Sequence, residues 1–242
     1  MKIRLIVRRA LFLILTAVIC SGSALIGKGY CVYREAVGSV SLETKVAEIQ
    51  EKEVYTQYED LPDDYINAVV AVEDKRFYIH PGIDPIAICR AVINDVKAMS
   101  FAEGGSTITQ QLAKNLYFSQ EKELTRKIAE MFVAFDLERN YSKNEIFELY
   151  VNTIYFGDGY YDVGTACAGY FGKEPADMTE YESTLLAGVP NAPSRYAPTK
   201  NPELAAKRQL QVVRRMEACG YFSEEEAETV AETVAAQLAL IP

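Results

Sequence analysis

GGSTITQQLAKN, residues 104–115, is the stretch that decides the fold of this 242-residue chain. It passes from a glycine pair into a helical pattern, with Ser106 or Thr107 placed to cap the helix start. Backbone amides exposed at such a helix start suit phosphate oxygens. An ordinary capped helix that binds no ligand would have the same sequence pattern. Residues three to four apart share one helical face, which here would carry three polar side chains: Gln111, Lys114 and Asn115.

Helical patterns continue on both sides of this stretch from residue 61 onward. Residues 64–72 form an apolar helical run that ends in charged residues, and a further helix is expected over 122–139. Capping-box patterns then open helices at Ser142, Thr179 and Ser223. With 49% hydrophobic residues and no low-complexity tract, the sequence predicts a mainly α-helical folded domain.

Residues 10–27, ALFLILTAVICSGSALIG, are uncharged and mostly apolar, and they follow Lys2, Arg4, Arg8 and Arg9. About 18 such residues can just cross a hydrocarbon core of roughly 30 Å. We therefore expect a single-pass transmembrane anchor over 10–27, with the basic segment 1–9 in the cytoplasm and the rest of the chain outside the cell membrane. A cleaved signal peptide is the alternative interpretation.

The remaining chain divides into a juxtamembrane connector over 28–60, with weak strand patterning at 38–42, and a catalytic domain over 61–242. The net charge of −9 argues against a nucleic-acid partner, because such binding depends on Lys and Arg neutralising phosphates. Five scattered cysteines lack zinc-ligand spacing. The stretch 104–115 has no Walker A ending, and we expect no organic cofactor.

Two carboxylates, Glu73 and Asp74, end the apolar run and are followed by Phe77 and by the chain's single histidine, His80. A helix that brings an acid to the edge of an apolar core desolvates the carboxylate. Desolvation raises the pKa of that carboxylate towards the range of a general base. A solvated helix end is the simpler alternative.

A second charged group, Arg126, Lys127 and Glu130, precedes an apolar run, so we expect these charges to face a cleft or each other. A structural ion pair is the alternative. Glu148 and Asn152 stand close to a loop rich in glycine and tyrosine. That combination suits sugar binding, although such residues more often simply pack.

Taken in order, these motifs resemble the glycosyltransferase domain of the peptidoglycan polymerases, which occurs alone or joined to penicillin-binding transpeptidases. The resemblance covers about residues 61–202 and rests on E-D-x-x-F-x-x-H-x-G from Glu73, G-x-S-T-I-T-Q-Q-L-x-K-N from Gly104, R-K-x-x-E from Arg126 and E-x-Y-x-N from Glu148. It implies a lysozyme-like fold of two lobes with a cleft between them. It also implies that lipid II is polymerised into glycan strands by inverting glycosyl transfer, with release of undecaprenyl pyrophosphate.

The resemblance further implies roles for individual residues. Glu73 is expected to be the general base, and Glu130 a second catalytic residue that orients the cations or holds Mg²⁺ or Mn²⁺ against the pyrophosphate. The implied substrate-binding residues are Asp74, Phe77, His80, Ser106, Thr107, Gln111, Lys114, Asn115, Arg126, Lys127 and Asn152. The implied partners are lipid II, the growing glycan chain, the bacterial membrane, and transpeptidases with other wall-synthesis proteins. Because the sequence ends at Pro242, we expect the monofunctional form.

Two other functions stay open at this point. A lytic enzyme of lysozyme type also uses a glutamate in a helical fold, but it needs no pocket for a pyrophosphate. A membrane scaffold without activity would not need Glu73 or Glu130. The paired cationic motifs therefore favour glycosyl transfer.

Overall fold

The computed structural model describes residues 2–98, 105–119 and 123–240, so Gly104 and Lys122, which begin two of the predicted segments, lie outside the described residues. The described chain forms α-helices and three short 3₁₀ turns, and it contains one isolated β-bridge but no strand. The prediction of a mainly α-helical fold is therefore confirmed. The α-helices are α1 Lys2–Ser39, α2 Leu42–Gln50, α3 Asp63–Glu73, α4 Pro85–Ala98, α5 Ile108–Tyr117, α6 Leu124–Asn140, α7 Lys143–Val151, α8 Val163–Phe171, α9 Glu180–Gly188, α10 Pro193–Tyr196, α11 Pro202–Cys219 and α12 Glu224–Ala239.

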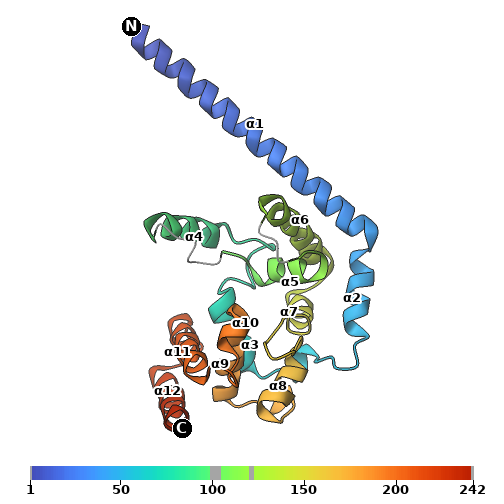
Figure 1. The fold of residues 1–242 in the computed structure, drawn as a ribbon, viewed down its shortest axis with the longest axis vertical. Helices are drawn as coiled ribbons and strands as arrows, with labels where there is room; N and C mark the ends of the chain where they lie inside the picture. The colour runs from blue at the N-terminus through green and yellow to red at the C-terminus, as the bar shows by residue number, and fades with distance from the viewer. Residues whose placement is uncertain (1, 99–104, 120–122, 241–242) are drawn as a thin grey trace.

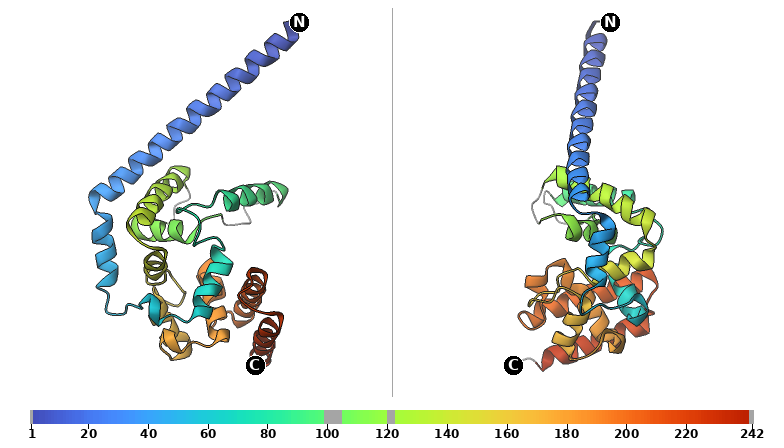
Figure 2. Two further views of the ribbon diagram at one scale, coloured as in Figure 1. Left: turned by 180° about the vertical axis from the view of Figure 1, so that it is seen from behind. Right: turned by 90° about the vertical axis from the view of Figure 1, so that its right-hand side faces the viewer.

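Helix α1 is one unbroken helix of 38 residues that leaves the body of the protein and carries the N-terminus far from it (Figures 1 and 2). Its apolar part is long enough to cross a membrane, and none of the most apolar stretch is buried inside the protein. The expected apolar N-terminal helix is therefore present. It extends well beyond residue 27, because residues 28–39 continue the same helix.

The lower end of α1 packs along α6, and the chain then turns at Val40 and Ser41 into α2. The side chain of Ser41 accepts a hydrogen bond from the Thr44 amide and thereby caps α2. The expected strand patterning at 38–42 is thus wrong: this segment is the end of one helix and the capped start of the next. The segment after Ser41 forms a helix because its apolar residues are spaced for one helical face: Leu42, Val46 and Ile49 are all buried.

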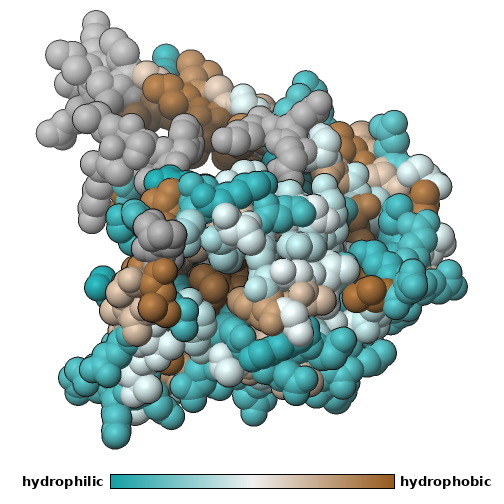
Figure 3. Space-filling model, turned by 60° about the horizontal axis from the view of Figure 1, so that its bottom comes forward, coloured by the Kyte–Doolittle hydropathy of each residue, from teal (hydrophilic) through white to brown (hydrophobic). Residues whose placement is uncertain are grey.

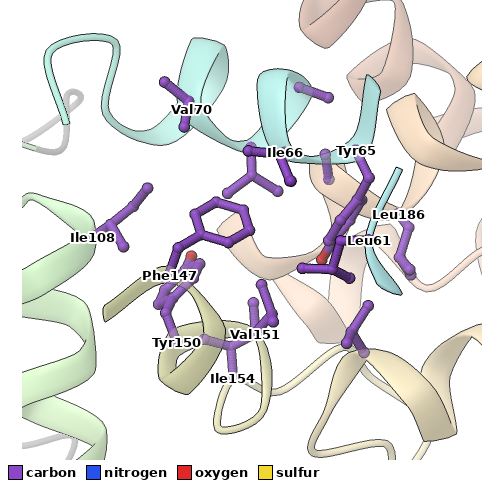
Figure 4. Close-up of a cluster of buried hydrophobic side chains, with 14 of the residues drawn as sticks. Leu61, Tyr65, Ile66, Val70, Ile108, Phe147, Tyr150, Val151, Ile154 and Leu186 are labelled. Atoms are coloured by element: carbon purple, nitrogen blue, oxygen red, sulfur yellow. The ribbon is translucent and has the colours of Figure 1, made fainter. Parts of the chain in front are cut away.

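The body of the protein has an upper part with α4, α5 and α6 and a lower part with α8, α9, α11 and α12, while α3 and α7 lie between them (Figure 1). Helix α3 packs on α9 and α11, and α5 packs on α6 and α7. Figure 4 shows the core where these helices meet, with side chains from α3, α5, α7 and α9. Tyr65, Phe147 and Tyr150 are fully buried there.

The helix starts follow the predicted chemistry. Capping boxes close the N-terminal ends of α5, α7, α9 and α12, with Thr107, Ser142, Thr179 and Ser223 as the capping residues. Each cap satisfies amides that a helix start leaves without partners. The face of the body drawn in Figure 3 is mostly hydrophilic, with apolar residues in small separate patches, in contrast to the exposed apolar surface of α1.

Candidate active site

Glu73 is the last residue of α3, which delivers its carboxylate from the apolar core to the edge of a cavity. One carboxylate oxygen, Oε2, accepts a hydrogen bond of 2.8 Å from the amide of Gln111. The other oxygen, Oε1, is buried without a hydrogen bond, and it lies 3.7 Å from the guanidinium of Arg208. Glu73 therefore keeps one oxygen available for a proton.

Burial raises the pKa of Glu73 above the ordinary value for glutamate. The neighbouring Asp74 raises it further, while the bond from Gln111 and the charges of Arg208 and Lys114 oppose the rise. A carboxylate with a raised pKa is a stronger base than an exposed one, and the nearby cations still favour its ionised form. This balance is what a general base near neutral pH requires.

The main cavity has a volume of about 560 Å³ and lies between the two parts of the body. Polar and basic side chains dominate its lining, so it suits an anionic, sugar-like ligand. The lining residues are Val72, Glu73, Arg90, Ser106, Gln111, Lys114, Pro190, Asn191, Tyr196, Arg208, Gln211 and Arg215. They come from α3, α4, α5, α10 and α11, from the 3₁₀ turn at Val189–Asn191 and from the segment just before α5.

A second cavity of about 340 Å³, here called the side cavity, continues from the main one. The two share Gln111, Lys114, Pro190 and Asn191 in their linings. The side cavity adds Asn115 from α5 and Tyr155 from the loop after α7. The two cavities thus meet at Lys114, and together they are called the groove here.

Lys114 extends from α5 into this groove, and no hydrogen bond or ion pair joins its ammonium group to another described residue. Burial and the charge of Arg126 lower the pKa of Lys114, and Glu73 counteracts that effect. A partly desolvated cation that is not held in an ion pair stabilises negative charge on a ligand strongly.

Helix α6 holds the second charged group behind Ser106. Glu130 is completely buried, and its two oxygens accept from Arg126 and, at 2.7 Å, from Lys127. Lys127 also donates to the Ser106 hydroxyl at 2.6 Å, and Ser106 lines the main cavity. Glu130 therefore fixes the direction of two cations, and Lys127 reaches the cavity through Ser106.

Burial, together with Arg126 and Lys114, lowers the pKa of Lys127 to about 8. Three cations are thus held close enough to repel one another, with Glu130 as the buried counterion. A bound polyanion would relieve the repulsion among these three cations, because each of them could then form a charge-assisted hydrogen bond with it.

Several residues predicted to bind substrate are instead buried beneath the site. Asp74 accepts a hydrogen bond of 2.8 Å from His80 and another of 3.0 Å from the amide of Ile108. Thr107 donates to the Gly82 carbonyl and caps α5. None of these side chains lines either cavity, and neither does the fully buried Phe77. These contacts fix the base-bearing turn against α5, and the expectation that Asp74, Phe77, His80 and Thr107 bind substrate stays a prediction.

The same contacts correct the expected anion site at the start of α5. Asp74 occupies the amide of Ile108, and the Thr107 side chain occupies that of Gln110. These amides are therefore committed to protein acceptors, and phosphate oxygens must be met by side chains instead.

Asn152 is likewise a structural residue. It is fully buried, and its amide exchanges hydrogen bonds with the backbone of Thr56 at 2.9 and 2.8 Å. Tyr55 donates to the Glu148 carboxylate beside it. The segment before α3 is thereby tied to α7, and the expectation that Asn152 binds substrate stays a prediction.

The described residues do not fit a resident metal at Glu130. Both of its oxygens are bonded to cations, and the described chain holds no group of three acidic, histidine or cysteine side chains that could form a metal site. Divalent cations prefer several oxygen ligands, which this position does not offer. No step below depends on a metal.

Sequence reasoning missed the contribution of α11. Arg208, Gln211 and Arg215 line the main cavity from one face of this helix. Their spacing of three and four residues was a readable signal, since such residues share a helical face. Arg208 lies 135 residues after Glu73, so only the fold shows that this helix faces the base.

Comparison with known proteins gives the following matches. The Transglycosylase family profile matches residues 42–217. Penicillin-binding protein 1A of Aquifex aeolicus is 46% identical over 178 residues, which is 74% of this chain and 24% of that protein. Penicillin-binding protein 1F of Bacillus subtilis is 45% identical over 170 residues, which is 70% of this chain and 24% of that protein. The chain thus spans about a quarter of the length of these curated relatives.

Among solved structures, a crystal structure of penicillin-binding protein 1A from Haemophilus influenzae matches with a TM-score of 0.45 and 22% sequence identity. The match covers 74% of this chain and 17% of that one.

Proposed function

Since this chain belongs to the transglycosylase family of peptidoglycan glycosyltransferases, we propose that it polymerises lipid II into glycan strands with release of undecaprenyl pyrophosphate. The observation that carries the proposal is the free oxygen of Glu73 at a cavity whose other charged lining residues are cations. A base and a preformed site for a polyanionic leaving group are the two requirements of this reaction.

In the proposed step, Glu73 takes the proton from the 4-hydroxyl of the acceptor N-acetylglucosamine. The oxygen of that hydroxyl forms a bond to the anomeric carbon of the donor N-acetylmuramic acid, and its configuration inverts. The bond from that carbon to the phosphate oxygen breaks, and its electron pair leaves with the pyrophosphate. The step thus ends with the proton on Glu73 and the negative charge on the released pyrophosphate, and it needs no further reactant.

The cations receive the charge that leaves the sugar. Lys114 faces the groove directly, and Arg126 and Lys127 stand behind Ser106 with Glu130 fixing their orientation. Arg208 lies on the other side, next to Glu73. Fixed cations need no reorganisation when charge develops, which is the main source of stabilisation at such sites.

Helix α1 determines on which side of the membrane the reaction takes place. We propose that α1 crosses the cell membrane with the N-terminus in the cytoplasm and the body outside, where the lipid-linked substrate is exposed. Basic residues before the apolar stretch support this orientation. Strands made there require cross-linking, so we expect transpeptidases and other wall-synthesis proteins to act beside this chain.

The proposed function is tested by incubating the full-length protein in liposomes with labelled lipid II and separating the products by length. Long glycan strands are expected. Shortening of preformed peptidoglycan, with no polymer made from lipid II, would instead establish the lysozyme-type alternative. Binding of lipid II with neither reaction would establish a scaffold.

The charge of Lys127 predicts an alkaline limit to activity. Because its pKa is lowered to about 8, Lys127 is charged below that pH and loses its charge as the pH rises through it. We expect kcat/KM, which reports the free enzyme, to fall on the alkaline side near pH 8. In Lys127→Arg the fall should disappear, because arginine stays charged throughout this range. An unchanged alkaline limb in the variant would assign that limb to another group.

A further inference from the structure

Helix α1 is more than a tether, because its lower end packs directly along the helix that carries the cations. Residues 29–37 of α1 run beside α6, and the most apolar stretch before them is not buried in the body. The point where α1 leaves the body is therefore fixed relative to Arg126 and Lys127, and it does not depend on a flexible linker.

Gly29 marks the closest approach of the two helices. A Cβ atom at this position would lie 2.5 Å from Cγ2 of Ile128 and 3.0 Å from the carbonyl oxygen of Thr125. No side chain fits between α1 and α6 here, so glycine is required for contact. Ile128 directly follows Lys127, and the contact thus falls on the helical turn that bears both cations.

Aromatic packing continues the contact for two further turns. The rings of Tyr30, Tyr33 and Phe132 form a triangle with centroid distances of 5.3 to 5.6 Å. The Tyr33 hydroxyl donates to Asp136 at 2.5 Å. Because Gly29 lies against Ile128 and Tyr33 reaches further along α6 to Asp136, the two helices run in the same direction, and these contacts together set their register.

This register places the cations at a definite depth. The apolar stretch of α1 ends at Gly27, and the next residues, Lys28 and Tyr30, are of the types that anchor helices at the membrane surface. Leu124, the first residue of α6, is 71% exposed at the same level. The end of the hydrocarbon core therefore coincides with the first turn of α6.

We propose that docking of α1 on α6 through Gly29 holds Arg126 and Lys127 at the level of the lipid headgroups. The pyrophosphate of a membrane-bound polyprenyl substrate lies at this level, so the substrate meets the cations without leaving the bilayer. The proposal rests on the proposed function and adds that the α1–α6 register sets the height of the site.

The test compares two substrates with three variants. The substrates are lipid II in liposomes and a water-soluble analogue with a short prenyl chain. Gly29→Val disrupts the contact, and Gly27→Val is its matched control because a Cβ there meets nothing within 4 Å. The third variant inserts four alanine and serine residues between Gly27 and Lys28, which lifts the intact α1–α6 unit by about 6 Å.

We expect Gly29→Val and the insertion to lower the rate with lipid II in liposomes at least about tenfold, since misplacement by ångströms is costly. Both should retain the wild-type rate with the short-chain analogue, and Gly27→Val should match wild type with both substrates. The insertion keeps the test valid should Gly29→Val fold poorly. The inference is overturned if both variants match Gly27→Val in liposomes, or if they lose both substrates equally. A wild-type protein inactive on both substrates would instead reject the proposed function itself.

Discussion

Replacing Glu73 with glutamine is expected to reduce kcat by about 10²- to 10⁴-fold, the usual contribution of a general base. Glutamine has the same shape and can still accept the hydrogen bond from Gln111, so the fold and the cavity should remain. The variant cannot take the proton of the acceptor hydroxyl. Rates of lipid II polymerisation in liposomes, measured at saturating substrate, provide the readout.

Two controls make the Glu73 result specific. Glu59→Gln changes an exposed glutamate on the segment before α3 and should leave the rate unchanged. Binding of lipid II to Glu73→Gln should stay within a few fold of wild type, because the cations that hold the pyrophosphate are untouched. Near-normal turnover by Glu73→Gln would remove this residue from the chemistry.

Replacing Lys114 with methionine is expected to cost about 10²- to 10³-fold in kcat, as for loss of one group that stabilises transition-state charge. Methionine keeps most of the length of the side chain and removes only the ammonium group. Because Lys114 has no ion-pair partner among the described residues, its loss breaks no salt bridge, although it removes one of the charges that lower the pKa of Glu73. The melting temperature should therefore change little while the rate of lipid II polymerisation falls.

Lys114→Arg is the companion variant, since it keeps the positive charge and should recover part of the lost rate. Lys173→Met controls for removal of a lysine elsewhere, because Lys173 pairs with Glu182 far from the groove. A wild-type rate in Lys114→Met would assign the leaving group to other cations. Equal losses in Lys114→Met and Lys173→Met would point to a general effect of charge.

Local patterns in the sequence were sufficient for the helices. The end of α3 at Glu73 and the caps at Thr107 and Ser142 depend on neighbouring residues alone, and the structure confirms them. The ion pairs of Glu130 with Arg126 and Lys127 also follow from helical spacing, since these residues lie three and four positions apart. Such contacts need no knowledge of the tertiary fold.

Contacts between distant segments could not be predicted in the same way. The pairing of Glu73 with Arg208 joins residues on α3 and α11, and that of Asn152 with Thr56 joins α7 to the segment before α3. The sequence of α1 indicated a membrane span but carried no sign that Gly29 meets Ile128. A polar residue in a motif can serve either the substrate or the packing, and only burial distinguishes the two.

The hydrogen bonds around Gln111 decide which oxygen of Glu73 can carry a proton. Burial raises the pKa of Tyr150 well above its ordinary value, so its hydroxyl stays protonated and donates to Gln111 at 3.3 Å. The amide of Gln111 is thereby fixed in one orientation, with its NH₂ group toward Oε2 of Glu73. A proton on Oε2 would face a donor, whereas Oε1 accepts no hydrogen bond and so can take the proton. The buried tyrosine thus makes the two chemically equivalent oxygens of Glu73 inequivalent. The same oxygen, Oε1, is then expected to take the proton in every catalytic cycle.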